Sequence, residues 1–256
     1  MRLLVFVALL FAAAARCPAQ AVADILETHL AAIGGKIRVN AVVSMKVKGK
    51  THTPDGDVDF TMLAARPNRV RVETVGKGRT LVQVYDGVSP PSAWDSVKQA
   101  WRPMDPLNAR RFVADADFDD PLVAAVDGVF TADYAGTEQR DGAKQIKLLL
   151  TRQSEPPFWI FLDAETYLVT GREDLRPSPM GGTLKIETHY DDFRLAGGIL
   201  VPRLVSVTEG TQKIQETTIL SIESNAEIPA DAFVPAPITL PASLAPASAS
   251  TARPSP

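Results

Sequence analysis

Apolar and polar residues alternate with two different periods along this chain. Apolar side chains from Val22 to Ile33 recur at spacings of three and four residues, which predicts an amphipathic helix that Gly34 ends. Beyond this helix the period becomes two, as in "VVSMKVKGKTHT", the turn "PDGD" and "VDFTMLAA". This pattern predicts a β-hairpin with one face more apolar than the other.

Similar alternating segments, joined mostly by short turns, continue to about residue 224. We count roughly ten or eleven strands, which predicts a mostly β (α+β) fold built on a single antiparallel sheet. A sheet of so many strands curls. We therefore expect a curved sheet that forms an unclosed β-barrel, with an N-terminal helix and a helical lid insert covering the hollow side.

The expected lid insert is "PMDPLNARRFVADADFDDPLVAAVDG". Two short helices fit it, around 107–114 and 121–126, each with a proline near its start, where a missing N–H costs least. We expect Asp119 or Asp120 to cap the second helix. Helices that only partly cover a curled sheet would leave an apolar cavity.

The segment "PPFWIFLDAETYLVTGRED" carries apolar side chains on both faces of a predicted hairpin. Trp159 and Phe161 point to one face, and Phe158, Ile160 and Leu162 to the other. We expect one face to lie towards the cavity and the other under a neighbouring segment, and the pattern does not say which. Large apolar residues could equally be plain core packing. The candidate cavity-lining residues are Phe60, Met62, Trp94, Trp101, Phe112, Trp159 and Phe161.

The two ends of the chain differ from its middle. Arg2 precedes "LLVFVALLFAAAA", and Ala19 and Ala21 form an A-x-A pattern, which predicts a cleaved secretory signal peptide over 1–21 and an exported, periplasmic protein. The apolar run is too short for a membrane span of roughly 20 residues. A lipid anchor on Cys17 is the alternative, but Arg16 stands where such a signal needs a small residue. We expect one domain over 22–235 and a disordered Pro/Ala/Ser-rich tail over 236–256.

Charge and candidate chemistry exclude several classes of function. The net charge is −3, and loss of Arg2 and Arg16 would leave 25 basic and 30 acidic residues. Such a chain has no basic block for nucleic acid or for strong attraction to anionic membranes. Cys17 is the single cysteine and would leave with the signal peptide, so the mature chain has no disulfide or thiolate site.

No pattern of catalytic or metal-binding residues stands out. The three histidines, His29, His52 and His189, share no catalytic or metal-ligand spacing. The "DADFDDP" segment places aspartates at alternate positions as a calcium loop does, but it lacks that loop's glycine and its final glutamate. We therefore predict no cofactor, no metal and no enzymatic step. An envelope hydrolase is the remaining catalytic alternative, since paired carboxylates can be assembled in space.

Several segments, in their order along residues 22–235, resemble the LolA/LolB-like outer membrane lipoprotein-sorting family. They include "ILETHLAAIGG", "ARPNRVRVE", "DFDDPL", "FWIFLDAETYLVTGRED", "HYDDFRLAGGILVPRLV" and "IPADAFVPAP". The "LDAETYL" turn and the piece from Asp192 to Pro202 are also similar to RseB/MucB-type sensors, which share that fold.

The resemblance implies an unclosed β-barrel with a helical lid that holds lipid or the acyl chains of lipoproteins. It also implies a periplasmic location and no chemical step. Carriers of this family use an arginine near the cavity to coordinate lid opening, and Arg69 and Arg71 lie in the comparable region. Two functions stay open: a carrier of lipid or lipoprotein, or an envelope sensor that binds a protein partner.

Overall fold

The computed structural model describes residues 18–153, 155–178 and 181–236. Residues 1–17 of the expected signal peptide (1–21) and residues 237–256 of the expected tail (236–256) therefore lie outside the described residues. The helices are α1 Pro18–Ala32, α2 Lys36–Ala41, α3 Pro106–Ala114 and α4 Pro121–Val126. The strands are β1 Ser44–Thr53, β2 Gly56–Ala65, β3 Arg69–Gly76, β4 Arg79–Tyr85, β5 Ser92–Asp95, β6 Ala100–Pro103, β7 Thr131–Arg140, β8 Ala143–Thr151, β9 Phe158–Asp163, β10 Val169–Pro177, β11 Thr183–Asp191, β12 Arg194–Ala196, β13 Ile199–Val201, β14 Leu204–Glu209 and β15 Gln212–Ser224.

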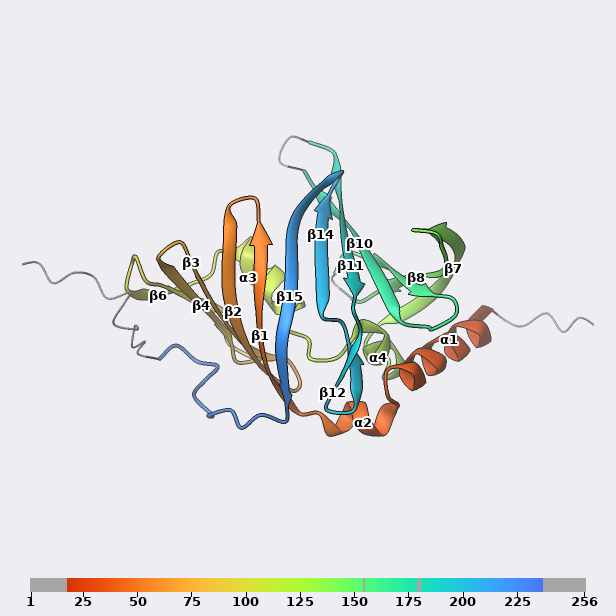
Figure 1. Ribbon diagram of the computed structural model, residues 1–256, viewed down its shortest axis with the longest axis horizontal. Coiled ribbons are helices and arrows are strands. Elements are labelled where there is room, and N and C mark those ends of the chain that lie inside the picture. The colour runs from red at the N-terminus through yellow and green to blue at the C-terminus, as the bar shows by residue number, and fades with distance from the viewer. Residues whose placement is uncertain (1–17, 154, 179–180, 237–256) are drawn as a thin grey trace, which may run out of the picture.

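Thirteen strands form one antiparallel sheet in the order β6-β5-β4-β3-β2-β1-β15-β14-β11-β10-β9-β8-β7. The two edge strands, β6 and β7, do not pair with each other, so the sheet is not closed (Figure 1). Strands β1 and β15, which are far apart in the sequence, pair with each other. This pair joins the half of the sheet made by β1–β6 to the half made by β15, β14, β11, β10, β9, β8 and β7. The predicted mostly β, unclosed antiparallel architecture is confirmed.

The strand number is higher than the ten or eleven expected. The additional strands of the sheet are β5 and β6, which carry Trp94 and Trp101 and have four residues each. Segments so short show no readable alternation. In addition, two expected strands around residues 183–209 are each split, and their inner pieces pair separately as β12 and β13.

The two helices of the insert lie where the sequence predicted, whereas α1 begins at Pro18, before the predicted start at Val22 and within the expected signal peptide. Asp105 and Asp120 are the N-caps of α3 and α4, and a proline follows each of them at the first helical positions. Gly34 follows α1 with φ of 131°, and a Cβ there would lie 2.7 Å from the carbonyl oxygen of Gly198. Only glycine fits a position with that backbone conformation and that close neighbour. The short helix α2 had not been predicted.

Strand register assigns side chains to two faces of the sheet. The helices α1, α3 and α4 pack against one side of the sheet, which we call the helix face. We call the opposite side the outer face. In Figure 1 the helices α3 and α4 lie behind the sheet. The main core lies on the helix face between α1, α4 and strands β8 to β10, and consists of Val22, Leu26, Leu122, Phe130, Ile146, Leu148, Leu150, Phe158, Ile160, Leu162 and Val169.

The outer face of β3 to β6 is in contact with the chain's own C-terminal segment, residues 225–236, which we call the C-terminal strap. Trp101 Nε1 donates a 2.8 Å hydrogen bond to the carbonyl oxygen of Ala236. The guanidinium of Arg69 lies 5.2 Å from the centre of the Phe233 ring. Because Phe233 is only 3% exposed, the strap is packed onto the sheet.

The 158–174 hairpin, apolar on both sides, is covered on both sides. Phe158, Ile160 and Leu162 belong to the helix-face core. On the outer face Phe161 is 0% exposed. Its ring lies 4.3 Å from the guanidinium carbon of Arg140 and 5.1 Å from the ammonium nitrogen of Lys147. The outer side is therefore covered by cation–π contacts.

Candidate functional site: a groove between α3 and the β4–β6 edge

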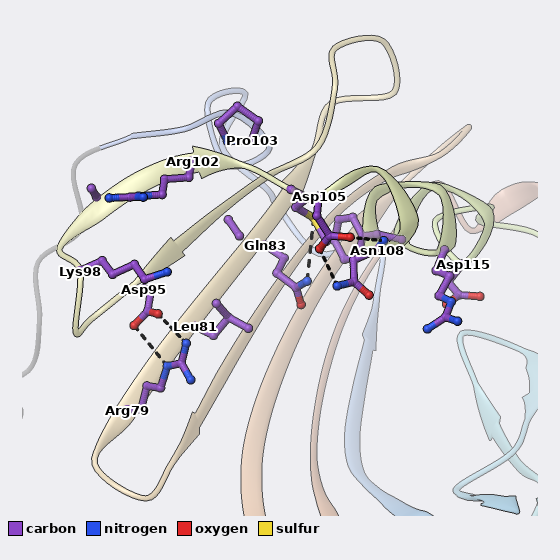
Figure 2. Close-up of a pocket in the computed structure, with 15 residues that line it drawn as sticks. Arg79, Leu81, Gln83, Asp95, Lys98, Arg102, Pro103, Asp105, Asn108 and Asp115 are labelled. Atoms are coloured by element: carbon purple, nitrogen blue, oxygen red, sulfur yellow. Dashed lines mark hydrogen bonds and ion pairs between the residues drawn. The ribbon is translucent and has the colours of Figure 1, made fainter. Parts of the chain in front are cut away.

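A groove of about 510 Å³ lies between α3 and the helix face of β4, β5 and β6. Figure 2 shows its lining residues. They are Arg79, Leu81, Gln83, Ala93, Asp95, Lys98, Ala100, Arg102, Pro103, Met104, Asp105, Asn108, Arg111, Phe112 and Asp115. The volume lies within the range of about 300–1,000 Å³ that is usual for small-molecule sites.

The middle of the groove has an apolar floor. Leu81 on β4 and Ala93 on β5 occupy helix-face positions, and Met104 and Phe112 come from the segment that leads into α3 and from α3 itself. All four side chains are half-buried. Phe112 also packs against the small core cluster that contains Tyr85. The groove thus presents hydrocarbon to anything that enters it.

Two of the groove's carboxylates are bound to neighbours. Asp95 accepts hydrogen bonds from Arg79, with Nε to Oδ1 at 3.2 Å, and from the backbone N–H of Val97 at 2.9 Å. The hydrogen bond from Arg79 is the main reason that the pKa of Asp95 is lowered. Asp105 caps α3 and accepts from the backbone N–H of Asn108 at 3.1 Å. Both charges are therefore compensated locally.

The cations of the groove are less completely paired. Within the part of the chain that the structure describes, the side chains of Lys98, Arg102 and Arg111 make no hydrogen bond or ion pair. Figure 2 shows Lys98 next to Asp95, which lies between Lys98 and Arg79, and Arg102 on the strand beyond, at the end formed by the β5–β6 hairpin. Asp115 lies at the opposite end, beyond Asn108.

Asp115 marks the end of the groove that is nearer the centre of the sheet. Although Asp115 is exposed at the surface, nearby protein raises the pKa of its carboxyl group by partial desolvation, and Arg172 and Arg176 on β10 oppose that shift. Arg172 itself donates to Asp174, with Nε to Oδ2 at 3.0 Å and Nη2 to Oδ1 at 2.8 Å. The groove therefore leads towards a polar cluster on the helix face of β10.

This cluster adjoins the core directly. The guanidinium carbon of Arg172 lies 3.9 Å from the centre of the Phe158 ring. Desolvation raises the pKa of Tyr190, on the neighbouring strand β11, to about 12. The Tyr190 hydroxyl is therefore neutral at physiological pH and can act as a hydrogen-bond donor.

A second cavity of about 140 Å³ lies among α1, α2, α4 and the β12–β13 hairpin. His29, Arg66 and Phe193 are among its lining residues. His29 is 2% exposed, and its Nδ1 lies 2.8 Å from the carbonyl oxygen of Tyr167. The small volume and these contacts indicate a structural junction between the helices and the hairpin.

Of the apolar residues proposed from sequence, Phe112 lines the groove. Met62 is on the helix face next to it, in contact with the same small core cluster. Phe60 shares the helix face of β2 with Met62, and its ring packs over Gly49, where an added Cβ would lie 2.6 Å away. These three residues lie on the same side of the sheet.

The remaining proposed residues lie on the outer face. Trp94 packs there with Val82 and Val84, and Trp101 lies beside it. Trp159 and Phe161 contact Lys147. Arg69 and Arg71 are near the C-terminal strap, with Arg71 Nη1 at 3.5 Å from the carbonyl oxygen of Ala232. Contact of these residues with a ligand stays a prediction.

The sequence analysis did not identify the charged residues of the groove, which are Arg79, Lys98, Arg102 and Arg111. It also did not identify Arg172. Arg79 begins β4 directly after a turn, Lys98 lies in the turn between β5 and β6, and Arg102 lies on β6, a strand that was not predicted. One signal was available. Arg172 and Asp174 are two residues apart in a predicted strand, which places them on one face.

The aspartate cluster around residues 115–120 has structural roles in the described chain. Asp117 forms a 2.5 Å ion pair with Arg152, Asp119 pairs with Arg66, and Asp120 caps α4 by accepting from Leu122. Among the described residues no group of three or more His, Cys, Asp and Glu could hold a metal ion. No described helix is long and apolar enough to cross a membrane.

Comparison with known proteins shows the fold. No protein-family model and no curated protein matches the chain. A domain from Vibrio parahaemolyticus that bears the name of an outer membrane lipoprotein-sorting protein aligns with 82% of this chain and 94% of its own length. Its sequence identity is 10% and its TM-score is 0.54.

A DUF1329 family protein from Desulfovibrio piger aligns with 86% of this chain and 98% of its own length, at 11% identity and a TM-score of 0.57. A LolA superfamily protein from Nitrosomonas europaea covers 86% of this chain and 99% of its own length, at 14% identity and a TM-score of 0.49. The first two alignments support the conclusion that the resemblance in sequence had suggested: this chain has a LolA-like fold.

Proposed function

We propose that this protein is a non-catalytic periplasmic binding protein that holds a lipid, or the acyl chains of a lipoprotein, against the helix face of its sheet. The observation that carries the proposal is the groove of about 510 Å³, with its apolar floor beneath α3. The lipoprotein-sorting name of a structural neighbour is consistent with this role. The signal peptide expected from the sequence supplies the route to the periplasm.

Burial of hydrocarbon supplies enough free energy for such binding. A chain of about a dozen CH₂ groups gains about 0.8 kcal/mol for each buried group, or roughly 10 kcal/mol before the cost of ordering the chain and the protein. No covalent step is needed to hold it. Release would then require opening of the groove.

Helix α3 is suited to such opening. None of its residues is buried, although it spans nine residues, Pro106–Ala114. Its contacts with the sheet are made by the half-buried Phe112 and Val113. An element with few buried contacts opens locally at low free-energy cost.

The proposal is tested by extracting the exported, purified protein with organic solvent and identifying what is released by mass spectrometry. A fluorescent fatty acid then titrates the emptied protein. We expect released lipid and saturable fatty-acid binding. Absence of both would overturn the proposal, and one stoichiometric protein partner without lipid would instead favour the envelope sensor.

Two leucine substitutions separate groove contact from general damage. Leu81→Gln places an amide on the groove floor, whereas Leu63→Gln makes the same change at a half-buried outer-face position of β2. We expect fatty-acid affinity to fall roughly tenfold or more in the first variant only, because an amide is costly to bury against hydrocarbon. Equal losses in both variants would contradict a site in the groove.

A further inference from the structure

We propose that the groove selects amphiphiles with an anionic headgroup, a phosphate or a carboxylate, which binds at Lys98 and Arg102. The hydrocarbon chain of the ligand then lies along the apolar floor towards α3. This inference rests on the proposed function and specifies its ligand. It follows from the distribution of charge in the groove.

The groove is more positive than the protein as a whole. Four cationic side chains and three carboxylates line it, in a chain whose net charge is −3. Asp95 is bound by Arg79 and Asp105 is used as a helix cap. The third carboxylate, Asp115, lies at the other end of the groove from Lys98 and Arg102 (Figure 2). At the end formed by the β5–β6 hairpin, three cations, Arg79, Lys98 and Arg102, therefore face the single carboxylate of Asp95, which leaves an excess of positive charge.

Strand geometry brings these cations to the groove. Arg102 is directly opposite Ala93 in the β5–β6 pair, and Ala93 is opposite Gln83 of β4, so all three belong to the helix face. Lys98 lies in the tight turn between β5 and β6, where its backbone N–H donates to the backbone carbonyl oxygen of Asp95. The two side chains are exposed and make no hydrogen bond or ion pair to described residues.

Lys98 and Arg102 differ in geometry, and both can bind the same anion in different ways. The arginine guanidinium presents a planar fork of donors to phosphate or carboxylate oxygens, and the lysine ammonium adds a compact positive charge. The apolar floor begins next to them at Ala93, Ala100 and Leu81. A headgroup at this end therefore leaves its chain directed over hydrocarbon, and a neutral headgroup would leave the cations without an anion.

Calorimetric titration with n-dodecyl phosphate and n-dodecyl maltoside, below their micelle-forming concentrations, tests the proposal because the two probes share one chain. We expect the phosphate to bind roughly tenfold more tightly at low salt, with the preference shrinking as salt screens the charges. Inorganic phosphate is the third probe. It should bind far more weakly than dodecyl phosphate, and equal affinity would overturn the amphiphile assignment in favour of a free-phosphate site.

The double variant Lys98→Gln, Arg102→Gln should bring the two dodecyl probes to nearly equal affinity, chiefly by weakening the binding of dodecyl phosphate. Arg110→Gln is the matched control. Arg110 is exposed on α3 and does not line the groove, so its variant should keep the preference. A preference that survives in the double variant, or an equal affinity of the native protein for both dodecyl probes, overturns the headgroup site. Failure of every dodecyl probe to bind overturns the proposed function itself.

Discussion

At the scale of single residues, His29 joins three elements of the fold. It is carried by α1, its Nδ1 lies 2.8 Å from the Tyr167 carbonyl oxygen in the β9–β10 turn, and its Nε2 lies 3.5 Å from Oδ1 of Asp120, the N-cap of α4. Burial lowers the pKa of the ring, but the Asp120 carboxylate and the Tyr167 carbonyl outweigh it, so the net pKa is raised. Protonated His29 therefore stabilises the junction of these elements.

This shift predicts a pH dependence of stability. Because the folded-state pKa is raised, the contribution is fully present below the unfolded-state pKa of about 6.5 and is lost as pH rises through the folded-state value. We expect Tm to fall as pH rises from about 6.5 through the folded-state pKa, and His29→Gln to flatten this slope. His52→Gln, at a side chain that is 74% exposed, is the control and should keep the slope. Thermal melts of the three proteins across this range check it, and a native slope in His29→Gln would contradict the assignment.

Aromatic residues of β9 give a second prediction at this scale. Phe161→Ala removes a ring that is 0% exposed and should cost about 3–5 kcal/mol of unfolding free energy. Trp159→Ala should cost less, because Trp159 is only half-buried. Denaturant unfolding measures both. Since both rings lie on the face opposite the groove, fatty-acid affinity per folded molecule should not change, and a loss of affinity at full stability would place a ligand on the outer face.

The sequence showed that the 158–174 hairpin is apolar on both faces, but it did not show which groups cover each face. Alternation gives two sets of side chains, and a period of two looks the same whichever set faces the helices. The covering groups also come from far along the chain or from polar residues. Arg140 and Lys147 cover Phe161 through their guanidinium and ammonium groups, and composition alone would assign such residues to solvent.

At the scale of elements, the two helices of the insert are held very differently. Helix α4 has only six residues, yet Leu122 and Val123 are buried in the core clusters. Helix α3 is longer and has no buried residue. Their sequences predicted both helices, because Asp–Pro pairs mark each start. The strength of their attachment depends on tertiary contacts that no local pattern contains.

This difference predicts unequal hydrogen exchange. Backbone amides of α3 should exchange much faster than those of α4, even though the shorter helix has less local support. Addition of dodecyl phosphate should slow exchange in α3 and leave α4 unchanged, since only α3 contributes residues to the groove. Exchange followed by mass spectrometry checks both statements. Equal protection of the two helices without ligand would contradict a lid role for α3.

At the scale of the whole molecule, the sheet has two covered faces rather than one. The helices cover the helix face, and the C-terminal strap packs on the outer face next to Trp101 and Phe233. The repeated alternation made a single curved antiparallel sheet predictable. The pairing of β1 with β15 and the path of the strap were not predictable, because both join segments more than 100 residues apart and no local period records such a contact.

The strap therefore belongs to the folded domain, whereas the Pro/Ala/Ser-rich tail beyond it is expected to be dispensable. A chain that ends at Ala236 should keep the Tm of the full protein, because it retains Phe233 and the carbonyl that accepts from Trp101 Nε1. A chain that ends at Asn225 loses both and exposes the apolar surface around Trp94. We expect this shorter chain to lose about 3–5 kcal/mol of unfolding free energy and its tryptophan emission to shift to the red.

Thermal melts and fluorescence spectra of the two truncated chains measure these effects side by side. The red shift reports the outer face specifically, because Trp94 and Trp101 both lie there beside the strap. A Trp101→Phe variant of the full chain keeps an aromatic ring but removes the donor to Ala236, so it should cost only about 1 kcal/mol. If the chain ending at Asn225 were as stable as the one ending at Ala236, the strap would contribute nothing, and the burial of Phe233 against Arg69 could not be part of what stabilises the sheet.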